Sequence, residues 1–182
     1  SEADELVKEI EDVSRRSKEE LTRLLEEAEK VSREHKKTLE ELLRRIEKVV
    51  RDIKEVLRGG TPREELLKTI RKLVEDVRRE LERLLRTNHE VVRRVEDRLR
   101  KLVEDNERVA RKVKDELRRR VSDEKKVREV EKLLDKLLEE SRKRAKEVLR
   151  ALRELNREVA EVVRRVEERL RRLLKEVEEA VR

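Results

Sequence analysis

The sequence repeats itself every 18 residues, and this period limits the folds open to the chain. Three segments align without a gap: EDVSRRSKEEL (11–21), EKVSREHKKTL (29–39) and EKVVRDIKEVL (47–57). A second set follows in LLKTIRKLVEDVRRELER (66–83), LLRTNHEVVRRVEDRLRK (84–101) and LVEDNERVARKVKDELRR (102–119). Eighteen residues complete five turns of an undistorted α-helix, whereas a heptad repeat forces a left-handed supercoil. The period therefore predicts long, nearly straight helices.

The spacing of the apolar residues decides between a helical bundle and a disordered chain. Charged residues make up 55% of the sequence and hydrophobic ones 34%, and Phe, Trp, Tyr, Met and Cys are absent. High charge alone would favour disorder. About seven positions in each 18 are apolar, however, and they keep a helical spacing that forms a stripe wide enough to face two neighbours. This composition is typical of long helices and bundles.

The first residues of the chain and the length of its apolar runs indicate whether it is secreted or spans a membrane, and its cysteine content indicates whether it can form disulfides. The start, SEADELVKEI, is acidic and amphipathic, unlike a signal peptide. No apolar run approaches the roughly 18 residues that a membrane span needs, so we expect a soluble chain with no membrane partner. The absence of cysteine excludes a disulfide framework and thiol chemistry.

The first helix break lies in LRGGTPREEL (57–66), which holds all the Gly and Pro of the chain. Gly59 or Gly60 can adopt the left-handed conformation that ends a helix. Thr61 is a favourable N-cap, Pro62 suits the first helical position, and Glu64 completes a capping box. We therefore expect one helix over about 2–58, starting after Ser1, and a second over about 62–120.

The second break is predicted within RRRVSDEKKV (118–127), where no Gly marks it. A continuous helix would place Glu124, Arg128 and Glu131 on the buried stripe, which excludes that alternative. Ser122 is a natural N-cap for a third helix over about 123–181. Short loops make successive helices antiparallel. The prediction is one all-α domain, residues 1–182, folded as an antiparallel up-down-up three-helix bundle with helices of roughly 85 Å.

A few polar residues interrupt the apolar stripe, and the antiparallel register gathers them at two levels. Folding about Gly60 pairs Ser14 with Asn106, Ser32 with Asn88, and Val50 with Ile70. Folding about Ser122 pairs Asn106 with Leu138, Asn88 with Asn156, and Ile70 with Leu174. We expect two buried hydrogen-bond layers, flanked by Thr38 and Thr87, and a third level that is apolar. The predicted network residues are Ser14, Ser17, Asn106 and Ser141 at one level and Ser32, His35, Asn88 and Asn156 at the other.

We expect these layers to have a structural role, which is to fix the register of the helices. A buried polar group left without a partner costs roughly 1–3 kcal/mol, and far less when its partners are present. A slip of any helix would separate all the members of a layer, so the layers would specify the register.

Catalysis and metal binding are alternative explanations of the same residues. Nucleophilic catalysis needs a serine, a base and an orienting acid at an open pocket, but no Asp or Glu lies on the stripe beside Ser32 and His35. A four-helix carboxylate site needs Glu-x-x-His, yet Ser32 and Arg86 precede the two histidines by three residues. His89 aligns with charged positions and should be exposed. We expect no catalytic residues, no metal and no cofactor.

Three further roles rest on weaker signals. His35 would make the stability depend modestly on pH, since histidine changes charge near neutral pH. Residues 59–121 carry 20 basic and 14 acidic residues, but no aromatic side chains are present to stack on bases, so we expect no nucleic-acid partner. Helix three has a wider apolar band, formed by Ala145, Leu149, Ala151, Ala160 and Val162. We expect a monomer. The alternative is that this apolar band mediates self-association or binds an added helix.

The gapless repeat, the GGTPRE connector, the Val/Leu/Ile core and the Glu/Lys/Arg surface resemble de novo designed helical bundles with buried hydrogen-bond networks. This resemblance covers the whole chain. It implies a stable structural scaffold that has no enzymatic activity, natural substrate or natural location and is expressed in the bacterial cytoplasm. Natural three-helix repeats of the spectrin type are the competing likeness, but they carry core aromatics and heptads.

Overall fold

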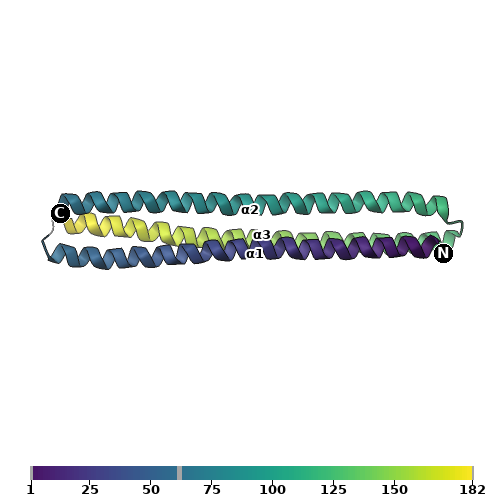
Figure 1. The fold of residues 1–182 in the computed structure, drawn as a ribbon, viewed down its shortest axis with the longest axis horizontal. Coiled ribbons are helices and arrows are strands. Elements are labelled where there is room, and N and C mark those ends of the chain that lie inside the picture. The colour runs from purple at the N-terminus through teal and green to yellow at the C-terminus, as the bar shows by residue number, and fades with distance from the viewer. Residues whose placement is uncertain (1, 61–62, 182) are drawn as a thin grey trace. The chain divides into compact units, whose positions relative to one another are not determined.

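Three long helices make up the fold. The computed structural model describes residues 2–60 and 63–181. Within them α1 spans Glu2–Arg58, α2 spans Arg63–Arg120 and α3 spans Glu124–Val181, with no strand in these two ranges (Figure 1). Consecutive helices run in opposite directions (Figure 1). The predicted all-α, up-down-up three-helix bundle is therefore confirmed.

The described residues fall into two compact units, and every helix contributes a segment to each of them. Unit 1 combines the residues up to Glu29 with Val92–Arg153, and unit 2 combines Lys30–Val91 with the residues from Glu154 onward. Both cores are aliphatic, because the stripe supplies only Leu, Ile, Val and Ala. In unit 1 one cluster consists of Leu6, Ile10, Ala110, Val113, Leu117, Val130 and Leu134. In unit 2 the most deeply buried residues include Leu39, Ile46, Ile70, Leu81, Val166, Leu170 and Leu173.

The first connector ends α1 with a left-handed glycine. Gly60 has a φ of 79°, which L-residues rarely adopt, so of the two candidate glycines it is Gly60 that takes this conformation. The backbone N–H of Gly59 donates to the carbonyl oxygens of Val56 (3.0 Å) and Glu55 (3.2 Å) and closes the last turn. The predicted helix starts at Ser1 and Thr61, and the predicted first helical residue Pro62, lie outside the described residues.

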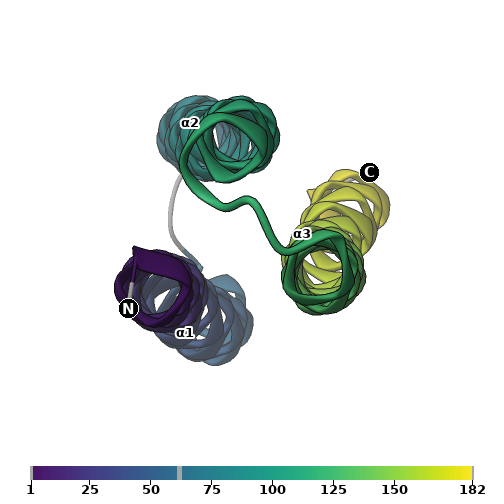
Figure 2. The same cartoon turned by 90° about the vertical axis from the view of Figure 1, so that its right-hand side faces the viewer.

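The second connector corrects one prediction. The N-cap of α3 is Asp123 and not Ser122: the Asp123 carboxylate accepts hydrogen bonds from the backbone N–H groups of Lys125 (3.0 Å) and Lys126 (3.4 Å). A carboxylate satisfies these free amides and complements the positive end of the helix dipole, which favours Asp over the neighbouring serine. Figure 2 views unit 1 from this end and shows the connector, with the three helices at the corners of a triangle.

The outer surface is charged, as the repeat predicts. His89 is exposed, which confirms its predicted place outside the stripe. Among the large hydrophobic residues that the structure describes, only Val56 is exposed, with 36% of its surface accessible to solvent. No helix in the described part of the chain has an apolar stretch long enough to span a bilayer.

Candidate functional site: two polar layers between the helices

The first polar layer, in unit 2, consists of Ser32 and His35 on α1, Asn88 on α2 and Asn156 on α3, and we call it the Asn88 layer. Asn88 is its centre and is only 1% exposed. The Asn88 Oδ1 atom lies 3.0 Å from His35 Nδ1 and accepts a longer hydrogen bond of 3.4 Å from Ser32 Oγ. The Asn88 Nδ2 atom donates to Asn156 Oδ1 at 3.1 Å. One amide therefore joins all three helices.

These partners determine the tautomer of His35. The Nδ2 group of Asn88 is directed to Asn156, so the atom facing the imidazole is the amide oxygen, which can only accept. His35 Nδ1 must therefore carry a proton and donate it. An imidazolium also carries a proton on Nδ1, so this hydrogen bond exists in both charge states of the ring.

The second polar layer, in unit 1, contains the predicted residues Ser14 and Ser17 on α1, Asn106 on α2 and Ser141 on α3, and we call it the Asn106 layer. Asn106 Nδ2 donates to Ser17 Oγ at 2.8 Å and to Ser141 Oγ at 2.9 Å. Ser17 and Ser141 are buried, and Asn106 is half-buried. Here too a single amide on α2 reaches both neighbouring helices.

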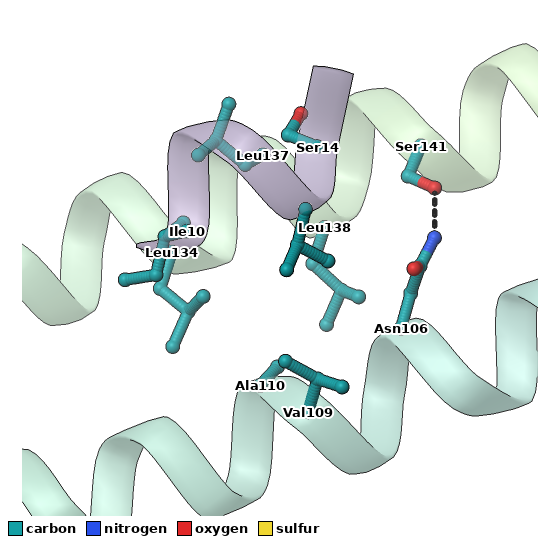
Figure 3. Close-up of a pocket in the computed structure, with 10 residues that line it drawn as sticks. Ile10, Ser14, Asn106, Val109, Ala110, Leu134, Leu137, Leu138 and Ser141 are labelled. Carbon is teal, nitrogen blue, oxygen red and sulfur yellow. Dashed lines mark hydrogen bonds between the residues drawn. The ribbon is translucent and has the colours of Figure 1, made fainter. Parts of the chain in front are cut away.

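Ser14 is placed in this layer by its sequence position, but the structure does not join it to Asn106. Its side chain is half-buried and makes no hydrogen bond to any described residue. Figure 3 shows Ser14 beside Leu137, with the dashed hydrogen bond running between Asn106 and Ser141 instead. Ser17, which lies one turn further along α1, is the residue that Asn106 binds.

Thr38 and Thr87 do not extend the Asn88 layer. Each hydroxyl donates to the carbonyl oxygen four residues earlier in its own helix, at 3.0 Å to Glu34 and 2.8 Å to Arg83. Thr22 and Thr69 make the same contact with Lys18 and Glu65. The threonines are thus satisfied locally, as hydroxyls on helices often are.

The two layers use their central amides differently because α3 supplies different partners. In the Asn88 layer Asn156 accepts from Nδ2, which leaves Oδ1 to face the two donors of α1. At the level of Asn106, the residue with the repeat position of Asn156 is Leu138, which cannot accept a hydrogen bond. The Asn106 Nδ2 group binds two serine hydroxyls instead. The pairing of Asn106 with Leu138 was the sequence signal for this difference.

An ion pair covers the outer side of the Asn106 layer and was not anticipated from the sequence. Arg142 follows Ser141, Glu107 follows Asn106, and the Arg142 Nε and Nη2 atoms both donate to Glu107 Oε1, at 3.2 and 3.0 Å. This pair bridges α2 and α3 directly beside the Asn106–Ser141 hydrogen bond. Arg142 and Glu107 are partly exposed, so we assign the pair a small contribution to stability.

The hydrogen bonds of the Asn88 layer show whether His35 can act as a base for the hydroxyl of Ser32. The hydroxyl of Ser32 and the Nδ1–H of His35 are both donors to Asn88 Oδ1, so they are directed at the amide oxygen and not at each other. His35 therefore does not act as the base of Ser32 through this nitrogen. In the ranges 2–60 and 63–181, no group of three or more His, Cys, Asp or Glu side chains is arranged to hold a metal ion.

Comparison with known proteins finds similarity at the level of structure. No protein-family model matches the chain, and no curated protein sequence is significantly similar to it. A solved structure described as a computationally designed three helix bundle is similar, with a TM-score of 0.52 and 15% sequence identity. The match covers 99% of this chain and 89% of that chain. At this identity the likeness shows a shared three-helix bundle fold.

Proposed function

We propose that this chain is a designed structural scaffold without catalytic activity, in which the two polar layers specify the register of the three helices. The observation that carries the proposal is that one amide in each layer, buried for Asn88 and half-buried for Asn106, bonds to both neighbouring helices. Asn88 bonds to residues of α1 and α3, and so does Asn106. The similarity in fold to a designed three-helix bundle supports the designed origin.

The physical basis is the geometry of a slipped helix. A shift by one residue moves a side chain about 1.5 Å along the axis and about 100° around it. Such a shift would carry Asn88 away from Asn156 and His35 and leave buried polar groups without partners, at a cost of about 1–3 kcal/mol for each group. Aliphatic side chains tolerate a slip better, because one Leu or Val contact resembles another. The polar layers thus discriminate between registers that the apolar stripe alone would not separate.

The chain itself provides the residues for an apolar control. The third level of the repeat carries Val50, Ile53, Ile70 and Leu174 at the positions that correspond to the Asn88 layer. Val50, Ile53 and Ile70 are buried in unit 2. A variant in which both polar layers adopt the residues of this level keeps the spacing and helix-forming character of the original. The substitutions are Ser14→Val, Ser17→Ile, Ser32→Val, His35→Ile, Asn88→Ile, Asn106→Ile, Ser141→Val and Asn156→Leu.

The experiment measures register and stability together. Because the chain has no cysteine, spin labels can be attached at two new cysteines, Glu34→Cys on α1 and Arg71→Cys on α2, which are both exposed in unit 2. These two positions lie at different levels along the helices, so a slip changes the distance between them by nearly its full length. We expect one narrow distance in the parent. In the apolar variant we expect additional distances displaced by about one helical turn, near 5.4 Å, with equal or greater resistance to guanidinium. A single narrow distance in both proteins would refute the register role.

The alternative role is self-association through α3. Of its five candidate residues, Ala145 and Val162 are already buried, and Leu149, Ala151 and Ala160 are half-buried. This burial favours a monomer, and we propose neither a nucleic-acid partner nor a small-molecule substrate for the scaffold. Size-exclusion chromatography with light scattering and refractive-index detection tests the proposal. A mass near 22.1 kDa supports the monomer, and a stable multiple of it supports the interaction module.

A further inference from the structure

The connector between α2 and α3 carries a serine hydroxyl that the fold does not use. Residues 121–123 lie outside the helices, and Figure 2 shows the connector crossing the end of unit 1. Ser122 is exposed, and its side chain makes no hydrogen bond to a described residue. Asp123 caps α3 in its place. The hydroxyl of Ser122 is therefore accessible to another molecule.

The last residues of α2 surround the approach to Ser122 with positive charge. Arg119 and Arg120 precede the serine by three and two residues. Their side chains are exposed and form no ion pair with a described residue, whereas Arg118 pairs with Glu131. Two unpaired guanidinium groups just before an accessible hydroxyl form a charge pattern that carboxylates of a protein kinase can bind.

We propose that Ser122 is a phosphorylation site for a serine/threonine protein kinase of the class that selects arginine two and three residues before the serine. In the reaction, Ser122 Oγ bonds to the γ-phosphorus of ATP, the bond from that phosphorus to the β,γ-bridging oxygen breaks, and ADP leaves. The hydroxyl proton passes to a carboxylate of the kinase. The site is separate from both polar layers, so it does not depend on their role in register.

The surroundings of Ser122 can accommodate the phosphoryl group. An open hollow of about 440 Å³ adjoins this residue, and Arg118 and Arg128 line it together with two glutamates. Residues 118–128 carry six basic and two acidic side chains. A phosphate with a charge of about −2 would thus enter a net positive region. It would also lie near the first turn of α3, where the helix dipole favours negative charge.

The last turn of α2 must open during the reaction, because a kinase binds the residues around the serine in an extended conformation. The hydrogen bond that closes this turn runs from the Val121 N–H to the Leu117 carbonyl oxygen, at 3.0 Å. Leu117 is fully buried, but residues 118–120 after it are exposed and Val121 is half-buried. Opening of this turn therefore displaces no fully buried side chain, and helix ends of this kind open at low cost.

The test incubates the full chain with ATP and the catalytic domain of a kinase of this class, and a free peptide of residues 116–126 is the positive control. Cleavage after glutamate releases residues 117–124, and mass spectrometry of this fragment locates the phosphoryl group. We expect one phosphoryl group on Ser122 and none in Ser122→Ala. The chain should react about tenfold more slowly than the peptide, because only a fraction of its molecules is open.

Two double variants test the role of the arginines. Arg119→Gln with Arg120→Gln removes two charges before the serine and should lower the initial rate by about tenfold or more, because charge-assisted hydrogen bonds to the kinase are lost. Lys125→Gln with Lys126→Gln removes the same charge after the serine and should leave the rate within about twofold of the parent. Circular dichroism checks that both variants keep the helical fold.

A second serine provides a control within the chain. Ser17 also follows two arginines, but it is buried within α1 and accepts a hydrogen bond from Asn106. It should therefore remain unmodified.

Four results would overturn the proposal. A chain that stays unmodified while the free peptide is phosphorylated would show that the end of α2 does not open. An unmodified peptide would show that the charge pattern does not recruit this class of kinase. Equal loss of rate in the two double variants would show that net charge, and not the position of the arginines, controls the reaction. Phosphorylation of Ser17 at the rate of Ser122 would show that placement in an exposed connector does not select the site.

Discussion

The Asn88 layer and the Asn106 layer are both centred on an asparagine of α2, and they differ in how completely that amide is used. Asn88 engages both its oxygen and its nitrogen, and its partners on α1 and α3 include an imidazole and a second amide. Asn106 engages only its nitrogen, and its side-chain oxygen makes no hydrogen bond to a described residue. A leucine in the place of the second amide accounts for the difference. The comparison teaches that a polar layer is complete only when every helix supplies complementary donors and acceptors.

The largest expected effect follows from removing the better-connected amide. Asn88→Ala would leave His35, Asn156 and the 5%-exposed Ser32 without their shared partner and would open space in the core. We expect the free energy of unfolding to fall by about 3 kcal/mol, because several polar groups lose hydrogen bonds at once. Guanidinium unfolding followed by circular dichroism at 222 nm measures this, since the chain has no tryptophan or tyrosine to report by fluorescence.

The same substitution in the other layer should have a smaller effect. Asn106→Ala would free Ser17 and Ser141, but serine hydroxyls can donate to the carbonyl four residues earlier in their own helix. Thr38 and Thr87 already do so in this protein. We expect a loss of about 1 kcal/mol in the same unfolding assay. If the two alanine variants prove equally destabilised, completeness of the layer is not what determines its contribution.

Ser14 and Ser32 offer a matched pair that should change stability in opposite directions. They occupy corresponding repeat positions, where the third copy carries Val50, and serine and valine have similar helix propensities. Ser32→Val removes a buried donor to Asn88 and should lower the free energy of unfolding by about 1 kcal/mol. Ser14→Val removes no protein hydrogen bond and adds apolar contact, so it should raise that free energy by about 0.5 kcal/mol.

Parallel unfolding curves of the two variants, compared with the parent, test this pair. A loss of stability in both variants would mean that Ser14 makes a hydrogen bond that the structure does not contain.

The smallest effect is expected at the rim of the Asn106 layer. Arg142→Gln removes the ion pair with Glu107, and an exposed pair contributes at most about 1 kcal/mol and often nothing measurable. We expect a change below about 0.5 kcal/mol that decreases further in high salt. Thermal unfolding at two sodium chloride concentrations detects it, with Glu107→Gln as the matched variant. A change comparable to that of Asn106→Ala would show that the ion pair belongs energetically to the layer.

Most of the fold could be predicted from the helical spacing of the apolar residues. Apolar residues at positions such as Val130, Val148 and Val166 repeat with the helical period, and all three are buried. The N-cap of α3 was harder to predict from the sequence. Ser122 and Asp123 are both good N-caps, and only the direction of the Asp123 carboxylate onto two backbone amides distinguishes them. Choices between adjacent residues of similar chemistry depend on local backbone geometry, which no pattern encodes.

The polar side chains on the buried stripe could be identified from the sequence, because the helical period and the antiparallel register are properties of the chain. Their hydrogen bonds could not, because these depend on how the helices pack. Asn106 binds Ser17 rather than Ser14, and Thr38 donates to its own helix rather than to the Asn88 layer. The physical reason is that a hydrogen bond depends on distances of a few tenths of an ångström and on angles. Those are set by how three helices pack together, and a one-dimensional pattern does not contain them.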